Sequence, residues 1–268
     1  MSRVPVLIHL LDEDPDLAIG IGATRMPAAR RRATAYVVGR DPGPADFLGA
    51  YGGAAGWLGL LILDGVILQH TAVLECTTTQ VLAPGDVFCP WELDQECALQ
   101  PSAVTFEVIA PSRLALLDDA FAERVRPWPQ IASALIGRAA RRAHGLTLAH
   151  GLAGYPRVDV RIVALLWHLA ERCGVALADE TVVLPVALTP RTIARMVGCE
   201  PGPVNSALAS LRREGLVSQT AGAWLLNGTL PLQIEFLLAR PKPRPLAVVS
   251  GGAHSRRGSR RFRSSSTG

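Results

Sequence analysis

Hydrophobic and polar positions along the chain change their period near residue 120. Between about residues 33 and 117, short apolar runs alternate with Gly, Pro and Asp, and the runs cover residues 35–39, 57–63, 66–70, 81–82, 87–88, 104–109 and 113–117. Many short strands with turn signals between them are typical of an antiparallel roll or barrel. The pattern therefore predicts an antiparallel roll or barrel in the amino-terminal half of the chain.

Two turn signals stand out inside this region. Asp64-Gly65 lies between the apolar runs 57–63 and 66–68, and Asp-Gly readily adopts the positive φ angles of a tight turn. We therefore expect a β-hairpin with its tip at Asp64-Gly65. The segment LAPGDVF, residues 82–88, predicts a second unit of strand, turn and strand.

Helical periodicity takes over after residue 128. Residues 129–152 carry Ile131, Leu135, Leu146 and Leu148 among many alanines, which indicates a long helix with a face for a partner helix. Residues 151–156 interrupt it, and a second helix is expected over residues 157–172. The segment TVVLPVAL, residues 181–188, resembles a short pair of strands in which Pro185 favours an edge position.

The next segment predicts a helix-turn-helix. Thr189 can cap a helix that begins at Pro190, because proline lacks the N–H that would be unpaired at this position. Gly198 permits a tight turn after this helix. A second helix is expected from about residues 201–203 to Gly215, which provides a left-handed C-terminal cap. The apolar runs 216–218 and 224–226 then predict a small β-hairpin, so that the whole unit is a winged helix.

Length and composition indicate the number of domains and the cellular location of the protein. A chain of 268 residues with 49% hydrophobic residues is long enough for two domains. No uncharged apolar run reaches the roughly 20 residues that span a bilayer, and acidic residues interrupt the first segment where a secretory signal is apolar. We therefore expect a cytoplasmic protein with no membrane partner. The five cysteines are scattered without a CxxC pair, which argues against a disulfide framework and a zinc site.

Charge is unevenly distributed. Residues 240–268 hold eight of the 27 basic residues and no acid, and the remaining 19 bases face 23 acids, a net charge of −4. The Pro-, Ser-, Gly- and Arg-rich end is predicted to be a flexible basic tail that attracts polyanions. Between Arg40 and Arg113 there are nine acidic residues and no Lys or Arg, so this stretch should repel anions.

Taken together, these segments resemble the Crp/Fnr family of bacterial transcription regulators. The most specific part is LTPRTIARMVGCEPGPVNSALASLRREGLVS, residues 188–218, which resembles the family's helix-turn-helix without a gap. LGLLILDGVI and LAPGDVF resemble strands and a Gly-Asp turn of the family's cyclic-nucleotide-binding-type roll. The resemblance implies an α+β fold with an extension at 1–32, a jelly-roll-like β-roll at 33–126, a dimerisation helix at 127–153, a winged helix at 154–230 and the basic tail at 231–268.

The chain departs from the family's cyclic-nucleotide cassette. After the Gly-Asp turn, cyclic-nucleotide-binding members have a Gly-Glu pair that contacts ribose and an Arg-Ser pair that contacts the cyclic phosphate. Where those members have the Gly-Glu pair, this chain has Cys89-Pro90-Trp91-Glu92-Leu93, and no Arg lies between this segment and Arg113. Since a phosphate needs positive charge or clustered N–H donors, we expect a regulator that is independent of cyclic AMP and that has neither cofactor nor metal.

The resemblance also implies which residues meet DNA. The family positions used most often for bases correspond to Pro201, Gly202 and Ser206, and the first and last, commonly Arg, are not Arg in this chain. Asn205 and Ser206 are the polar candidates for base readout, with Glu200 for a cytosine amino group. A local cap is the alternative role for Asn205. The residues expected to contact phosphates are Thr189, Arg191, Arg195, Thr220, Arg212 and Arg213. For Arg212 and Arg213, the alternative is that they form only a solvated helix end.

The sequence thus predicts a homodimeric regulator that binds double-stranded DNA and acts through recruitment of RNA polymerase or through occlusion. Two alternatives stay open. The roll could sense an uncharged or cationic effector, or the winged helix could bind protein in a signalling scaffold. An enzyme is disfavoured, because the sequence shows no nucleophile with a base, metal cluster or phosphate loop.

Overall fold

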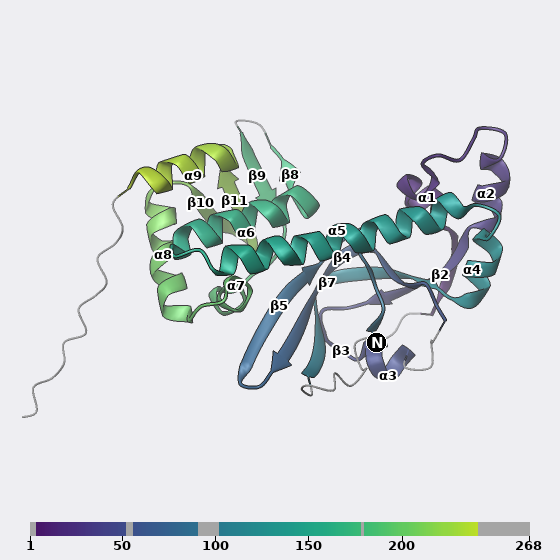
Figure 1. The fold of residues 1–268 in the computed structure, drawn as a ribbon, viewed down its shortest axis with the longest axis horizontal. Coiled ribbons are helices and arrows are strands. Elements are labelled where there is room, and N and C mark those ends of the chain that lie inside the picture. Colours follow the sequence, from purple (N-terminus) through teal and green to yellow (C-terminus); the bar gives the residue numbers. More distant parts are fainter. Residues whose placement is uncertain (1–3, 52–55, 91–101, 178–179, 241–268) are drawn as a thin grey trace, which may run out of the picture.

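The computed structural model describes residues 4–51, 56–90, 102–177 and 180–240. These residues form an antiparallel β-sheet domain and a second domain rich in helices. The long helix α5 (Pro129–Ala153) runs from one domain to the other (Figure 1). The arrangement confirms the predicted α+β class and the predicted long helix.

The first domain is a seven-stranded sheet with the order β1-β2-β7-β4-β5, in which β3 also pairs with β7 and β6 with β4. All of its strand pairs are antiparallel. Its strands are β1 (Val6–His9), β2 (Thr34–Arg40), β3 (Gly43–Ala45), β4 (Gly59–Val73), β5 (Cys76–Leu82), β6 (Val87–Phe88) and β7 (Ser102–Leu117). The predicted segments 57–63 and 66–70 are thus parts of one strand, as are 104–109 and 113–117.

The predicted hairpin at Asp64-Gly65 is wrong. Ile62 pairs with Leu114 and Ile67 pairs with Val108, so that both sides of Gly65 follow the same strand, β7, and the chain does not reverse. The register shifts between Ile62 and Ile67, which makes this region a β-bulge. Gly65 has φ +87°, and a Cβ there would lie 2.4 Å from the Pro111 carbonyl oxygen. The Asp-Gly pair therefore bends a continuous strand.

Residues 82–88 form the predicted unit of strand, turn and strand. The turn between β5 and β6 is closed by Asp86, whose Oδ2 accepts a hydrogen bond of 2.9 Å from the Ala83 N–H. Strand β6 then pairs with β4. The stretch after Pro90 that bears on the cyclic-nucleotide cassette, residues 91–101, lies outside the described residues.

Residues before β2 add to the core of the first domain. β1 pairs with β2 along four residues, and it is followed by helix α1 (Leu10–Glu13), the short 3₁₀ helix η1 (Pro15–Ala18) and helix α2 (Met26–Arg32). Leu10, Leu11 and Leu17 are buried against Ile131 and Leu135 of α5. A further helix, α3 (Phe47–Tyr51), places Phe47 edge-on against the rings of two strand residues, Phe88 and Phe106.

Helix α4 (Asp119–Val125) leads from the sheet to α5. Asp118 caps it by accepting a hydrogen bond of 2.6 Å from the Phe121 N–H. The first half of α5 is tied to the first domain, because the buried Arg138 donates to both carboxylate oxygens of Asp14. The second half of α5 carries the exposed apolar side chains of Leu146 and Leu148.

The second domain contains the predicted winged helix. Its helices are α6 (Val158–Cys173), α7 (Pro190–Val197), α8 (Pro201–Arg213) and α9 (Leu230–Ala239). Its sheet has the order β10-β11-β9-β8 and consists of β8 (Val175–Ala176), β9 (Thr181–Leu184), β10 (Val217–Thr220) and β11 (Ala223–Asn227). The helices predicted at 157–172 and 190–197 and the hairpin predicted after Gly215 are all confirmed.

Two expectations for this domain need correction. Only Thr181–Leu184 of the expected strand pair 181–188 is a strand, and it lies inside the sheet between β11 and β8. Pro185 ends it, and the side chains of Val186 and Leu188 are buried in the connection that follows. In addition, the sequence predicts a flexible tail from residue 231, whereas residues 230–239 form α9. Residues 241–268 lie outside the described residues.

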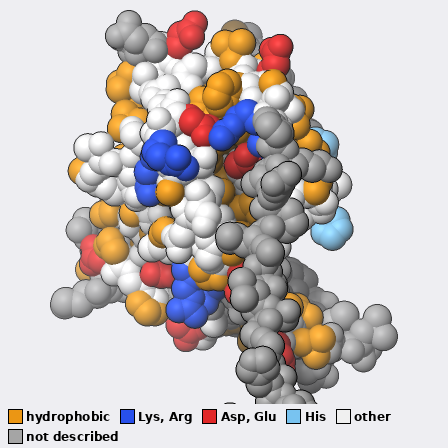
Figure 2. Space-filling view, turned by 90° about the vertical axis from the view of Figure 1, so that its left-hand side faces the viewer, with side chains coloured by type: hydrophobic (Ala, Val, Ile, Leu, Met, Phe, Trp, Pro, Cys, Tyr) orange, Lys and Arg blue, Asp and Glu red, His pale blue; other side chains and the backbone are white. Residues whose placement is uncertain are grey.

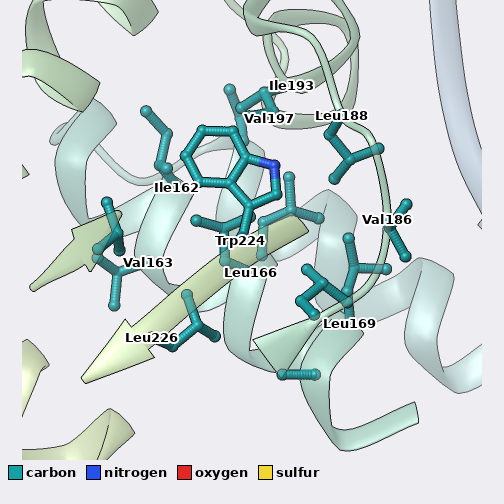
Figure 3. Close-up of a cluster of buried hydrophobic side chains, with 14 of the residues drawn as sticks. Ile162, Val163, Leu166, Leu169, Val186, Leu188, Ile193, Val197, Trp224 and Leu226 are labelled. Carbon is teal, nitrogen blue, oxygen red and sulfur yellow. The ribbon is translucent and has the colours of Figure 1, made fainter. Parts of the chain in front are cut away.

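Trp224 is the centre of the second core. It is fully buried on β11, and Figure 3 shows its indole ring among aliphatic side chains from α6, α7 and the connection before α7. Helix α9 closes this core through the buried Gln233, whose amide N–H groups donate to the carbonyl oxygens of Leu216 and Asn227 at 2.9 and 2.6 Å. Gln233 also accepts a hydrogen bond from the Trp167 indole N–H at 3.1 Å. The side-chain amide of Gln233 therefore links the wing, α6 and α9 through hydrogen bonds.

Candidate nucleic-acid interface

The helix-turn-helix forms where the sequence predicts it. The Thr189 hydroxyl caps α7 by accepting a hydrogen bond of 3.1 Å from the Thr192 N–H, and Pro190 is the first helical residue. Gly198 adopts the left-handed conformation with φ +65° and ψ +49°. The chain can therefore leave α7 and enter α8 within a few residues.

Burial fixes how α8 lies. Val204, Leu208 and Leu211, at positions i, i+4 and i+7, are at most 1% exposed and face the second core. The opposite side of the helix is therefore turned to solvent. Gly215, with φ +69°, follows the helix end as expected.

Arg161 of α6 braces the turn, and sequence reasoning missed it. Its Nη1 donates to the Val197 carbonyl oxygen at 3.0 Å, and its Nε donates to the Tyr155 carbonyl oxygen at 2.5 Å. The first of these carbonyls belongs to the last turn of α7, where helix carbonyls lack partners within the helix. The sequence did not single it out, because α6 also carries the polar residues Asp159, His168, Glu171 and Arg172.

All of the candidates for base readout lie on the solvent side. Pro201, Gly202, Asn205 and Ser206 of α8 are exposed, and so is Glu200, which precedes the helix. Among the described residues, the Asn205 side chain makes no hydrogen bond, so its amide is available to a base edge. The Ser206 hydroxyl donates to the Gly202 carbonyl oxygen at 3.3 Å, which leaves its lone pairs for an approaching donor.

The candidates for phosphate contact are less uniform. Thr189, Arg191 and Arg213 are exposed, whereas Arg195 is half-buried. Arg212 is held by the wing, because its guanidinium lies 5.3 Å from the centre of the Trp224 ring and its Nη2 donates to the Gln219 Oε1 at 3.0 Å. Arg212 is also exposed, so it has both a partner within the protein and access to solvent.

The wing presents Thr220 at its tip. Strand β10 pairs with β11 in a hairpin whose last pair is Thr220 with Ala223. The two residues between them, Ala221 and Gly222, both have positive φ angles, as in a type I′ turn. Thr220 is exposed next to this turn, in a position that a phosphate can reach.

Basic side chains do not form one continuous surface at this end of the molecule. Figure 2 faces the end that carries α8 and α9, and it shows small basic groups separated by acidic, apolar and other side chains. One arginine is engaged by an acid, since Arg240 pairs with Glu214 at 2.5 Å. Attraction to phosphates from the described residues is therefore distributed over a few separate arginines.

The described residues contain no group of three His, Cys, Asp or Glu side chains placed to hold a metal ion. The four cysteines in the described ranges, Cys76, Cys89, Cys173 and Cys199, are free thiols. In the same part of the chain, no helix combines the length and the apolar character needed to cross a membrane.

Comparison with known proteins identifies the fold. No protein-family model matches the chain, and no curated protein sequence matches it. Among solved structures, a Crp/Fnr-family transcriptional regulator of Thermus thermophilus is 19% identical, with a TM-score of 0.51 over 74% of this chain and 98% of that one.

Two further structures agree. The c-di-GMP-responsive global regulator CLP of Xanthomonas campestris is 16% identical, with a TM-score of 0.51 over 78% of this chain and 100% of that one. A mutant of CooA from Carboxydothermus hydrogenoformans is 18% identical, with a TM-score of 0.51 over 66% of this chain and 77% of that one. The chain therefore has the fold of Crp/Fnr transcription regulators, as its resemblance in sequence implied.

Proposed function

We propose that the protein is a homodimeric, sequence-specific DNA-binding transcription regulator of the Crp/Fnr type, not an enzyme, and that it acts in the cytoplasm. The observation that carries this proposal is the solvent-facing side of α8. Its first two turns expose Asn205 and Ser206, and its buried side packs against the core. A helix presented in this way fits the major groove of B-DNA.

Base readout is assigned to three polar side chains. Asn205 can pair with the N6 and N7 edge of adenine, Ser206 can accept or donate, and Glu200 can accept from a cytosine amino group. Pro201 and Gly202 contribute only backbone and apolar contacts. The family's frequent arginines are missing from this surface, so shape and deformability of the DNA should contribute much of the selectivity.

Phosphate contacts are assigned to both sides of α8. Thr189, Arg191 and Arg195 belong to α7 and its cap, and Thr220 belongs to the tip of the wing. Arg213 is exposed at the end of α8. Arg212 is bound to the wing, and from there it is proposed to contact the phosphate backbone of the DNA. These contacts position the protein and carry no sequence information.

Homodimerisation is assigned to α5. Among the exposed residues of α5, one set recurs at intervals of three or four, as in a coiled-coil seam, and it consists of Ile136, Ala139, Ala143, Thr147 and His150. The two alanines allow the backbones of two such helices to approach closely. A dimer built on this seam would present two α8 helices to successive major grooves about 34 Å apart.

The roll supports independence of cyclic AMP. Arg113, the first basic residue after Arg40, is held by the carboxylates of Glu13 and Asp64 at 3.0 and 2.7 Å. These ion pairs hold the Arg113 guanidinium at the bulge in the sheet, so it is already paired with carboxylates and not free for a cyclic phosphate.

At promoters, we propose that the protein either recruits RNA polymerase or blocks its access to the DNA.

Selection of binding sites from a pool of random DNA duplexes with the full-length protein tests this function. We expect an enriched site with two-fold symmetry. Asn205→Ala should lower the preference for that site over random duplex by about 1–3 kcal/mol, the value of one good base contact. For Ser206→Ala the control is Thr24→Ala, because Thr24 carries an exposed hydroxyl group in the first domain, before α2. Equal affinity for all duplexes would contradict the proposal.

A further inference from the structure

A pocket of about 660 Å³ lies where the turn between β5 and β6 meets helices α5 and α6. Its volume is in the range of small-molecule sites, and it is far larger than one inorganic ion requires. Its basic lining residues come from both helices and are Arg138, Arg141, Arg142, His144, His168 and Arg172. Apolar side chains of Leu165, Leu169 and Met196 complete the wall.

Two of the four arginines are neutralised inside the protein. Arg138 is paired with Asp14, and Arg172 is paired with Asp86. Arg141 and Arg142 have no carboxylate within ion-pair distance in the described ranges. The other two acids of the lining, Asp16 and Glu171, are exposed to solvent. Positive charge is therefore left without a partner on the α5 wall.

Arg142 is the most informative of these residues. It is half-buried, and only neutral groups accept its hydrogen bonds, namely Gln69 Oε1 at 2.9 Å and the Val87 carbonyl oxygen at 3.3 Å. Its buried Nε has no hydrogen-bond partner among the described residues. Burial, together with the nearby Arg172, lowers the pKa of Arg142, although Asp86 acts in the opposite direction.

A guanidinium withdrawn from water without a counter-ion is costly, and an anion in the same pocket would offset that cost. Arginine is also the side chain best suited to grip a phosphate or a carboxylate, because its planar fork donates two parallel hydrogen bonds. We propose that this pocket binds a small organic anion whose phosphate or carboxylate group is held by Arg141 and Arg142. The apolar wall accommodates the remainder of the molecule.

This assignment differs from the effector expected from the sequence, which was uncharged or cationic and located in the roll. The nine acids between Arg40 and Arg113 dominate the roll, whereas the arginines of α5 and α6 come later in the chain. Folding brings them against the turn that contains Asp86. A bound anion would therefore touch the sheet domain, the long helix and the first helix of the second domain together.

Titration calorimetry on the full-length protein tests the proposal, with sodium pyrophosphate and sodium citrate as separate probes at constant ionic strength. We expect saturable binding of at least one probe, and the probe that binds identifies phosphate or carboxylate as the recognised group. Arg141→Gln and Arg142→Gln should each weaken binding about tenfold, the loss expected for one charged hydrogen-bonding partner. Arg31→Gln, which changes an exposed arginine on α2, should leave binding unchanged.

Two results would overturn the proposal. One is the absence of saturable binding for both probes, and the other is binding that neither pocket substitution weakens, which would place the anion elsewhere, as on the basic tail. Arg142→Gln loses contacts to Gln69 and Val87 and could impair folding, so Arg141→Gln decides the test if circular dichroism shows such a loss. The measurement contains no DNA, so its outcome is separate from that of the DNA-binding proposal.

Discussion

Arg172 of α6 forms an ion pair with Asp86 in the turn between β5 and β6, and this contact joins the second domain to the sheet domain. The Arg172 side chain also donates to the Val81 carbonyl oxygen at 3.3 Å, and Asp86 in turn closes its own turn by accepting from Ala83. Around the pair, Val66, Leu68 and Val81 of the sheet share one apolar cluster with residues of α6 and α7. The orientation of the second domain is thus tied to one turn of the roll.

Replacement of Arg172 by Met should destabilise the protein by about 1.5–3 kcal/mol, the range for hydrogen bonds to charged groups. The reason is that the carboxylate of Asp86, a residue that is 7% exposed, would lose the cation with which it pairs. Chemical denaturation measures the change. Arg126→Met is the control, because the ion pair of Arg126 with Glu123 is exposed and should contribute less than about 1 kcal/mol. Equal losses in the two variants would contradict the prediction.

Gly198→Ala should cost about 1–2 kcal/mol of stability, because a residue with a Cβ is strained at the φ of +65° found there. The added Cβ would also lie 3.4 Å from the Cβ of Ala153 at the end of α5. Thermal unfolding compares this variant with Gly202→Ala, where a Cβ meets nothing within 4 Å. We expect the second change to be neutral or slightly stabilising, and a loss as large as that of Gly198→Ala would argue against left-handed strain as the cause.

Gln233→Leu should destabilise the second domain by about 1–3 kcal/mol, the cost of leaving a buried polar group without a partner. The substitution conserves most of the volume but removes the acceptor of Trp167 and the donors to Leu216 and Asn227. Intrinsic tryptophan fluorescence during urea unfolding reports the change. Glu235→Leu, on the exposed side of the same helix, should have little effect, and a similar loss there would point to α9 itself and not to the amide.

Arg191→Gln should weaken binding to specific and random duplex alike. Each phosphate contact that is lost should reduce the slope of log affinity against log salt by about 0.9. Fluorescence anisotropy over a range of salt concentrations measures this slope. Arg126→Gln provides the matched control, because it removes an exposed arginine on the other domain and should leave the slope unchanged. A slope that does not change in Arg191→Gln would remove this residue from the interface.

Local signals explain why much of the second domain could be predicted. Thr189, Pro190 and Gly198 act through their own backbone geometry, and the buried positions of α8 recur at helical spacing. The outcome at Asp64-Gly65 shows where local reasoning ends. The same dipeptide fits a hairpin tip and a bulge, and only pairing of both flanks with β7 selects the bulge. Similarly, α9 depends on hydrogen bonds of the buried Gln233 to residues outside the helix. The local sequence, a short apolar segment followed by a basic tail, did not predict them.

Sequence by itself determined the class of fold, the position of the helix-turn-helix and the side of α8 that faces solvent, because these follow from periodicity, caps and turn residues that act over a few positions. Tertiary structure alone decided that Arg161 braces the turn, that Arg172 meets Asp86 and that Arg141 and Arg142 line a pocket. Those contacts join residues that are tens of positions apart in the chain. Their geometry depends on how two domains pack around α5, and no local pattern encodes that packing.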